Sequence, residues 1–151
     1  MSTRFQAFDT LAVSGVRTLS PYQPGKPESA LKREYGIDHI VKLASNENPV
    51  GCSPRVAAAI SETLADLTRY PDGAGFSLKD ALAKRHNLDT SMVTLGSGSS
   101  EVIELVARVF VAPGDEVVFS QHAFAMYPLI TQAVSGVPVE VPACEWGHDL
   151  S

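Results

Sequence analysis

Residues 92–110 read MVTLGSGSSEVIELVARVF, and this stretch decides the fold. Its first part, Met92 to Leu95, predicts a short buried strand. A small-residue turn follows at Gly96 to Ser100, and apolar residues then recur at helical spacing at Val102, Leu105, Val106 and Val109. The pattern predicts a strand, a tight turn and a helix.

The turn before this helix is suited to hold a phosphate. The first backbone N–H groups of a helix have no intrahelical acceptor, and the positive end of the helix dipole lies behind them. Gly98 lets the backbone approach an anion closely, and the hydroxyls of Ser99 and Ser100 can donate hydrogen bonds to its oxygens. These residues indicate a phosphate site, although Ser99 acting only as a helix cap is the open alternative.

Two well-known phosphate loops do not match this turn. A P-loop ends in Gly-Lys-Ser or Gly-Lys-Thr, and the turn contains no lysine. The dinucleotide fingerprint G-x-G-x-x-G fits Gly96 and Gly98, but Glu101 stands at its third glycine. The sequence therefore disfavours NAD and ATP as ligands.

Composition narrows the class of protein. The 151 residues are 44% hydrophobic, enough for one domain with a core, and the net charge of −5 disfavours nucleic acid and anionic membranes as partners. The first twenty residues lack an apolar targeting segment, which favours a soluble, cytoplasmic protein. Cys52 and Cys144 are too few and too isolated for a disulfide framework, and no metal site is predicted.

The first half of the chain is predicted to be an arm followed by short elements. Prolines interrupt residues 1–27, a helix over 28–35 should end at Gly36, and a strand over 39–44 should lead into an Asn-rich turn. One helix should then begin after Ser53 as its cap, and a second should begin with a capping box of Ser77 and Asp80.

The second half alternates strands and helices. Strands are predicted over 116–119 and 137–141, with a mostly helical segment over 123–133 between them, in which Pro128 fits only the first turn or a kink. This alternation predicts an α/β fold with a mostly parallel sheet. Ligands bind beyond the carboxyl ends of such strands, where the loops 96–100 and 120–124 should meet.

Six motifs follow one another along the chain: SPYQPGKP at 20–27, KLASNENP at 42–49, RYPDG at 69–73, TLGSGSS at 94–100, PGDEVV at 113–118 and FAMYP at 124–128. In this order they resemble the histidinol-phosphate aminotransferases, which are fold-type I pyridoxal-phosphate enzymes with threonine-phosphate decarboxylases and aromatic aminotransferases as near relatives. The resemblance covers nearly the whole chain. It implies the N-terminal part of a three-layer α/β large domain preceded by an extended arm.

The resemblance also implies roles for individual residues. Gly98, Ser99 and Ser100 match positions that hold the phosphate of pyridoxal 5'-phosphate (PLP), and Phe124 matches the aromatic residue that stacks on its ring. Tyr70 matches a tyrosine that reaches the PLP phosphate of the neighbouring subunit in a homodimer. On the substrate side the matching positions are Tyr22, again from the partner subunit, and Asn46.

Members of the resembled family are more than twice as long, and their second half supplies the Schiff-base lysine. No lysine here stands in a matching setting, so no catalytic residue is assigned and the chain alone is expected to be an inactive fragment. We expect residues 1–45 to form the arm with the first helix and strand, and 46–151 an incomplete large domain with an open apolar sheet edge.

The implied activity of the parent enzyme is transfer of an amino group between L-histidinol phosphate and 2-oxoglutarate, in histidine biosynthesis. Its partners would be a small amino donor and a 2-oxo acid. The alternatives are a related PLP enzyme, or a non-catalytic protein that binds a phosphate ligand or another chain.

Overall fold

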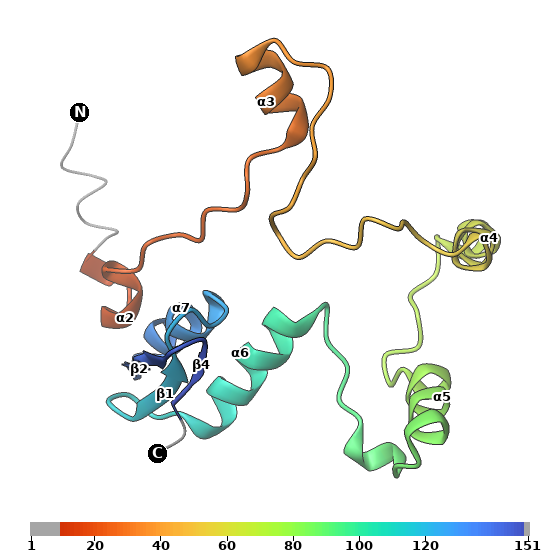
Figure 1. Cartoon of the computed structure of the whole chain (residues 1–151). Coiled ribbons are helices and arrows are strands. Elements are labelled where there is room, and N and C mark those ends of the chain that lie inside the picture. Colours follow the sequence, from red (N-terminus) through yellow and green to blue (C-terminus); the bar gives the residue numbers. More distant parts are fainter. Residues whose placement is uncertain (1–9, 150–151) are drawn as a thin grey trace. The chain divides into compact units, whose positions relative to one another are not determined.

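The computed structural model describes residues 10–149, which form two units. Figure 1 shows the elements in chain order. The first unit combines residues 10–22 with 88–149 and contains α2 (Ser14–Arg17), η2 (Thr90–Met92), α6 (Ser99–Phe110), β1 (Glu116–Ser120), α7 (Met126–Ala133), β2 (Val137–Val141), β3 (Ala143–Cys144) and β4 (Gly147–His148). The second covers residues 23–87 and contains α3 (Glu28–Tyr35), α4 (Pro54–Thr63), η1 (Leu64–Asp66) and α5 (Phe76–His86).

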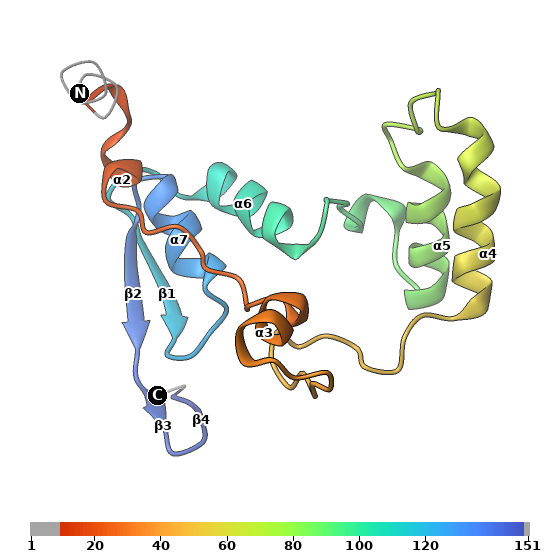
Figure 2. The same cartoon turned by 90° about the horizontal axis from the view of Figure 1, so that it is seen from above.

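The centre of the first unit is a strand, a helix and a second strand. β1 and β2 pair in parallel, from Glu116 opposite Val137 to Ser120 opposite Val141, and they lie side by side in Figure 2. Parallel neighbours need a crossover connection, which α7 provides. Pro128 lies in the first turn of α7, where its missing N–H costs no helical hydrogen bond. The predicted α/β alternation is confirmed in this segment.

A small core holds α7 to its neighbours. Among the described residues, the buried side chains of this unit are Ala107, Ile130 and Thr131, and the Thr131 hydroxyl donates to the Tyr127 carbonyl at 2.8 Å. α2 packs closely on α7 because Gly15 has no side chain: a Cβ there would lie 1.9 Å from the Gln132 carbonyl oxygen. Many large apolar side chains remain outside this core, including Val109 at 71% exposure and Val118 at 63%.

Local start and stop signals place the helices of the second unit. α3 ends at Gly36, whose φ of 64° is left-handed, and the Gly36 N–H donates to the Lys32 carbonyl at 3.0 Å. α4 starts after Ser53, whose hydroxyl accepts from the Arg55 N–H at 3.3 Å, with Pro54 as its first residue. Both predicted helices are confirmed.

Two predicted strands are wrong. In 39–44 the backbone forms no ladder, and Leu43 is 93% exposed. In 92–95, Met92 belongs to η2, and Val93 is extended at φ −111° and ψ 116° but lies in no ladder. A strand is defined by its neighbour, and within residues 10–149 the ladders join only β1 to β2 and β3 to β4.

The predicted capping box of α5 is also wrong. The helix begins at Phe76 after Gly75, so Ser77 lies inside the first turn and is not its cap. Asp72 takes that role: its carboxylate accepts from the N–H of Phe76 at 2.8 Å and of Ala74 at 3.0 Å. Asp80 pairs instead with Lys84, one turn later, at 2.7 Å.

This carboxylate cap should make the start of α5 sensitive to acid. The hydrogen bonds from Phe76 and Ala74 lower the pKa of Asp72 below its ordinary value of 3.8. A lowered folded-state pKa means that the cap stabilises the turn above about pH 4 and stops doing so as the pH falls through that lowered value. Amide hydrogen exchange should show protection of the Phe76 N–H at about pH 5 that declines as the pH falls below about 4, through the lowered pKa of Asp72. Asp72→Asn keeps an acceptor that does not titrate, so equal pH dependence in both proteins would contradict this role.

No helix among residues 10–149 is long and apolar enough to cross a membrane.

Candidate functional site

The helix that follows the predicted phosphate loop begins where it was expected, although the strand predicted before the loop is absent from residues 92–95. α6 begins at Ser99 with Gly98 as N-cap, at φ 93° and ψ 172°, a conformation that favours glycine. Within residues 10–149 no side chain caps the start of this helix, and its first helical hydrogen bond is donated by the Val102 N–H to the Gly98 carbonyl at 3.4 Å. The N–H groups of Ser99 and Ser100 therefore precede the hydrogen-bonded turns and have no intrahelical acceptor.

The loop at this helix start is open at Gly98 and crowded at Gly96. A Cβ on Gly98 would meet nothing within 4 Å, so the side of the loop at Gly98 is open to a ligand. A Cβ on Gly96 would lie 2.9 Å from Val102 Cγ2 and 3.1 Å from Glu101 Oε2, so the loop is closed there. The Glu101 carboxylate accepts from the Ser97 N–H across this closed side. In the sequence, Glu101 stands out only because it replaces the third glycine of the dinucleotide motif, and the motif comparison does not predict this contact.

Phe124 lies in the connection between β1 and α7 in the same unit. Its ring packs edge-to-face with Tyr127, with centroids 6.5 Å apart and planes at 87°, and the residue is 45% exposed. A ligand can therefore still reach part of the aromatic side chain.

A polar cluster at the carboxyl ends of β1 and β2 was not predicted. The Gln121 N–H donates to the Val141 carbonyl at 2.7 Å, and its side-chain oxygen accepts from the Ala143 N–H at 3.0 Å. The Ser120 hydroxyl lies 2.6 Å from His148 Nδ1. These bonds hold the first residues of the loop that carries Phe124. The only sequence signal for the cluster is the run of polar residues at 120–122.

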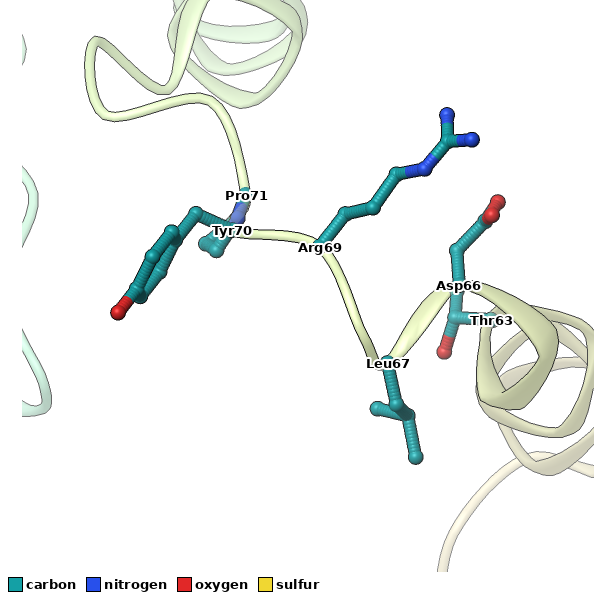
Figure 3. Close-up of a pocket in the computed structure, with 6 residues that line it drawn as sticks. All are labelled: Thr63, Asp66, Leu67, Arg69, Tyr70 and Pro71. Carbon is teal, nitrogen blue, oxygen red and sulfur yellow. The ribbon is translucent and has the colours of Figure 1, made fainter.

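Tyr70 lies in the second unit beside an open pocket of about 660 Å³. Its side chain is fully exposed, and Figure 3 shows it projecting away from Arg69 and Asp66. The pocket is lined by Thr63, Asp66, Leu67, Arg69, Tyr70 and Pro71. Tyr70 is thus free to contact a ligand or another protein.

The two predicted substrate-side residues belong to different units. Tyr22 is 53% exposed and ends the N-terminal segment of the first unit. Asn46 lies in the second unit, in a turn where both it and Ser45 have positive φ, at 50° and 70°. The Asn-rich turn is therefore confirmed. The first unit holds Gly98, Ser99, Ser100, Phe124 and Tyr22, and the second holds Tyr70 and Asn46.

Among residues 10–149, no three His, Cys, Asp or Glu side chains are grouped so that they could hold a metal ion. Cys52 and Cys144 are free thiols at the surface.

Known proteins match this chain over most of its length. Histidinol-phosphate aminotransferase 2 of Pseudomonas fluorescens Pf-5 is 59% identical over 145 residues, covering 95% of this chain and 39% of that protein. Histidinol-phosphate aminotransferase 1 of Idiomarina loihiensis is 56% identical over 136 residues, covering 90% and 37%. The crystal structure of histidinol-phosphate aminotransferase from Sinorhizobium meliloti in complex with pyridoxal-5'-phosphate superposes with a TM-score of 0.78 at 26% identity, over 91% of this chain and 36% of that one.

The chain thus spans under two-fifths of the length of these relatives. Its fold is that of the N-terminal part of a fold-type I aminotransferase. The family model for aminotransferase class I and II matches residues 38–151, three quarters of the chain. The chain belongs to the class I and II aminotransferases.

Proposed function

We propose that this chain is the N-terminal part of a PLP-dependent histidinol-phosphate aminotransferase. The whole enzyme would exchange an amino group between L-histidinol phosphate and 2-oxoglutarate. The identity of 51–59% to proteins of that name supports the substrate. The observation that carries the cofactor is the start of α6, where backbone donors lack helical partners and a Cβ on the neighbouring Gly98 would meet no atom within 4 Å.

The residues at this helix start fit a phosphate monoester. The N–H groups of Ser99 and Ser100 would donate to phosphate oxygens, and both hydroxyls can add hydrogen bonds. The positive end of the α6 dipole favours the dianion, and Gly98 leaves room for it. When bound, PLP supplies an aldehyde and an electron-withdrawing ring, which make exchange of an amino group possible.

Phe124 would orient the ring of the cofactor. An aromatic side chain that is still 45% exposed can stack against a pyridine ring and exclude water from one of its faces. This chain's part in the reaction is therefore to bind and orient the cofactor, while proton transfer is left to groups of the whole enzyme.

Tyr70, Tyr22 and Asn46 would complete the site. Tyr70, fully exposed, would donate its hydroxyl to the PLP phosphate of a second subunit in a homodimer. Tyr22 would reach a partner's substrate in the same way, and Asn46 would contact substrate within its own subunit. Both substrates are small and highly polar, so we assign the enzyme to the cytoplasm.

The proposed function can be tested with a chimera, in which this chain is joined to the remaining C-terminal part of the Pseudomonas fluorescens protein and so reaches the length of its relatives. The purified chimera should turn over L-histidinol phosphate with 2-oxoglutarate at least about tenfold faster, in kcat/KM, than it turns over phenylalanine. Faster turnover of the aromatic amino acid would reject the substrate and keep the reaction class. Binding of PLP without turnover of either amine would reject both.

A further inference from the structure

Glu101 sits where its side chain can shape the phosphate loop. It is the third residue of α6, and its carboxylate reaches back to accept from the Ser97 N–H, just before the N-cap. In a capping box a glutamate at this position bonds to a backbone N–H at the start of its own helix in a similar way. Here the bond ties the loop preceding Gly98 to the first turn of the helix.

The packing around Gly96 shows how closely the carboxylate lies against the loop. A Cβ at Gly96 would come within 3.1 Å of Glu101 Oε2 and 2.9 Å of Val102 Cγ2. The loop backbone therefore rests on the Glu101 and Val102 side chains, and glycine is needed for that contact. At Gly98, by contrast, a Cβ would meet no atom within 4 Å.

We propose that Glu101 is a positioning residue for the phosphate site. By holding the Ser97 N–H, its carboxylate fixes the loop on one side, so that the N–H groups of Ser99 and Ser100 are held ready for an anion on the other. The proposal rests on the proposed function, because it takes the phosphate of PLP as the anion.

Glu101 has two opposing effects on an anion at this helix start. Its acceptor oxygen orders the loop, which favours binding, whereas its negative charge repels a phosphate dianion. A glutamine keeps an acceptor oxygen and loses the charge, and an alanine loses both. The two substitutions therefore separate positioning from charge.

The test measures PLP affinity by calorimetric titration of the full-length chimera proposed above, as the unmodified chain, and of two variants of it. Glu101→Gln should bind PLP as tightly as the unmodified chain or up to about threefold more tightly, because the repulsion is removed. Glu101→Ala should bind about tenfold more weakly, which corresponds to about 1.4 kcal/mol. Glu104→Ala is the matched control, since Glu104 is on the same helix and pairs with Arg108 at 2.7 Å, away from the loop. It should leave PLP affinity unchanged.

A second readout follows the loop without any ligand. Amide hydrogen exchange at the Ser97 N–H should speed up in Glu101→Ala and remain slow in Glu101→Gln and Glu104→Ala. Pyridoxal, which has no phosphate, should bind all four proteins equally.

The possible failures are distinguishable. Saturable PLP binding that is equal in the unmodified chain and in Glu101→Ala would overturn the role of Glu101 alone. Absence of saturable binding by the unmodified chain would overturn the proposed cofactor site, and this inference with it. An affinity of Glu101→Gln as weak as that of Glu101→Ala would show that the charge, not the acceptor, favours binding, and would also overturn the proposal.

Discussion

Replacing Ile130 with alanine is expected to lower the free energy of unfolding of the first unit by about 3 kcal/mol, within the range of about 2 to 5 seen for such core truncations. Ile130 is only 5% exposed, and the other side chains buried among the described residues of its unit, Ala107 and Thr131, are small. Its truncation removes the largest apolar side chain buried there and leaves a cavity between α7 and its neighbours. Urea unfolding followed by circular dichroism at the helix band measures the loss.

Val109→Ala is the control for this prediction. Val109 is on α6 of the same unit and is 71% exposed, so its truncation removes little buried surface and should change stability by no more than about 0.5 kcal/mol. Equal losses at the two positions would contradict the view that packing around α7 holds the unit together.

Helices were predictable where their signals are local. Ser53 before Pro54 and Gly36 after Tyr35 act through hydrogen bonds within a few residues, and the structure has both helices where those signals put them. Asp72 shows the limit of such reasoning. Its carboxylate, four residues before Phe76, accepts from the Phe76 N–H, whereas Ser77 lies inside the helix and does not cap its start.

Strands were predictable only where the chain itself supplies the partner. Segments 116–120 and 137–141 lie one crossover apart, so each provides the ladder that the other needs. Segments 39–44 and 92–95 have similar apolar patterns but no ladder partner among the described residues. Side-chain pattern specifies which face of a strand is apolar, and it does not specify the neighbour.

In the candidate site, too, the local patterns were predictable and the contacts between distant residues were not. A glycine followed by serines at a helix start is a local pattern, and Gly98, Ser99 and Ser100 have the expected arrangement. The bond from Ser97 to Glu101 was not predictable from the motif comparison, because that comparison asks only whether a glycine stands at position 101. The pairing of Ser120 with His148 joins residues 28 positions apart through β4, which no local pattern specifies. The boundary between arm and large domain at residue 45, and the role of each site residue, stay predictions.

Placing a negative charge at the first position of α6 should abolish most PLP binding. We expect Ser99→Glu to weaken PLP affinity at least about 100-fold, because a carboxylate there competes for the N–H groups of the first turn and repels the phosphate dianion. Ser99→Ala keeps the backbone donors and loses only the hydroxyl, so it should cost about tenfold, in line with the loss of one hydrogen bond to a charged group at about 1.5 kcal/mol. Calorimetric titration with PLP measures both variants.

Val109→Glu is the matched control for the charge. It adds the same carboxylate to the same helix, near the end opposite the phosphate loop and at an exposed position, so PLP affinity should stay within about twofold of the unmodified chain. The comparison separates a local anion site from a general effect of net charge, since both variants carry one more negative charge. Equal weakening in the two variants would mean that the phosphate senses the overall charge of the chain, and that the start of α6 is not where it binds.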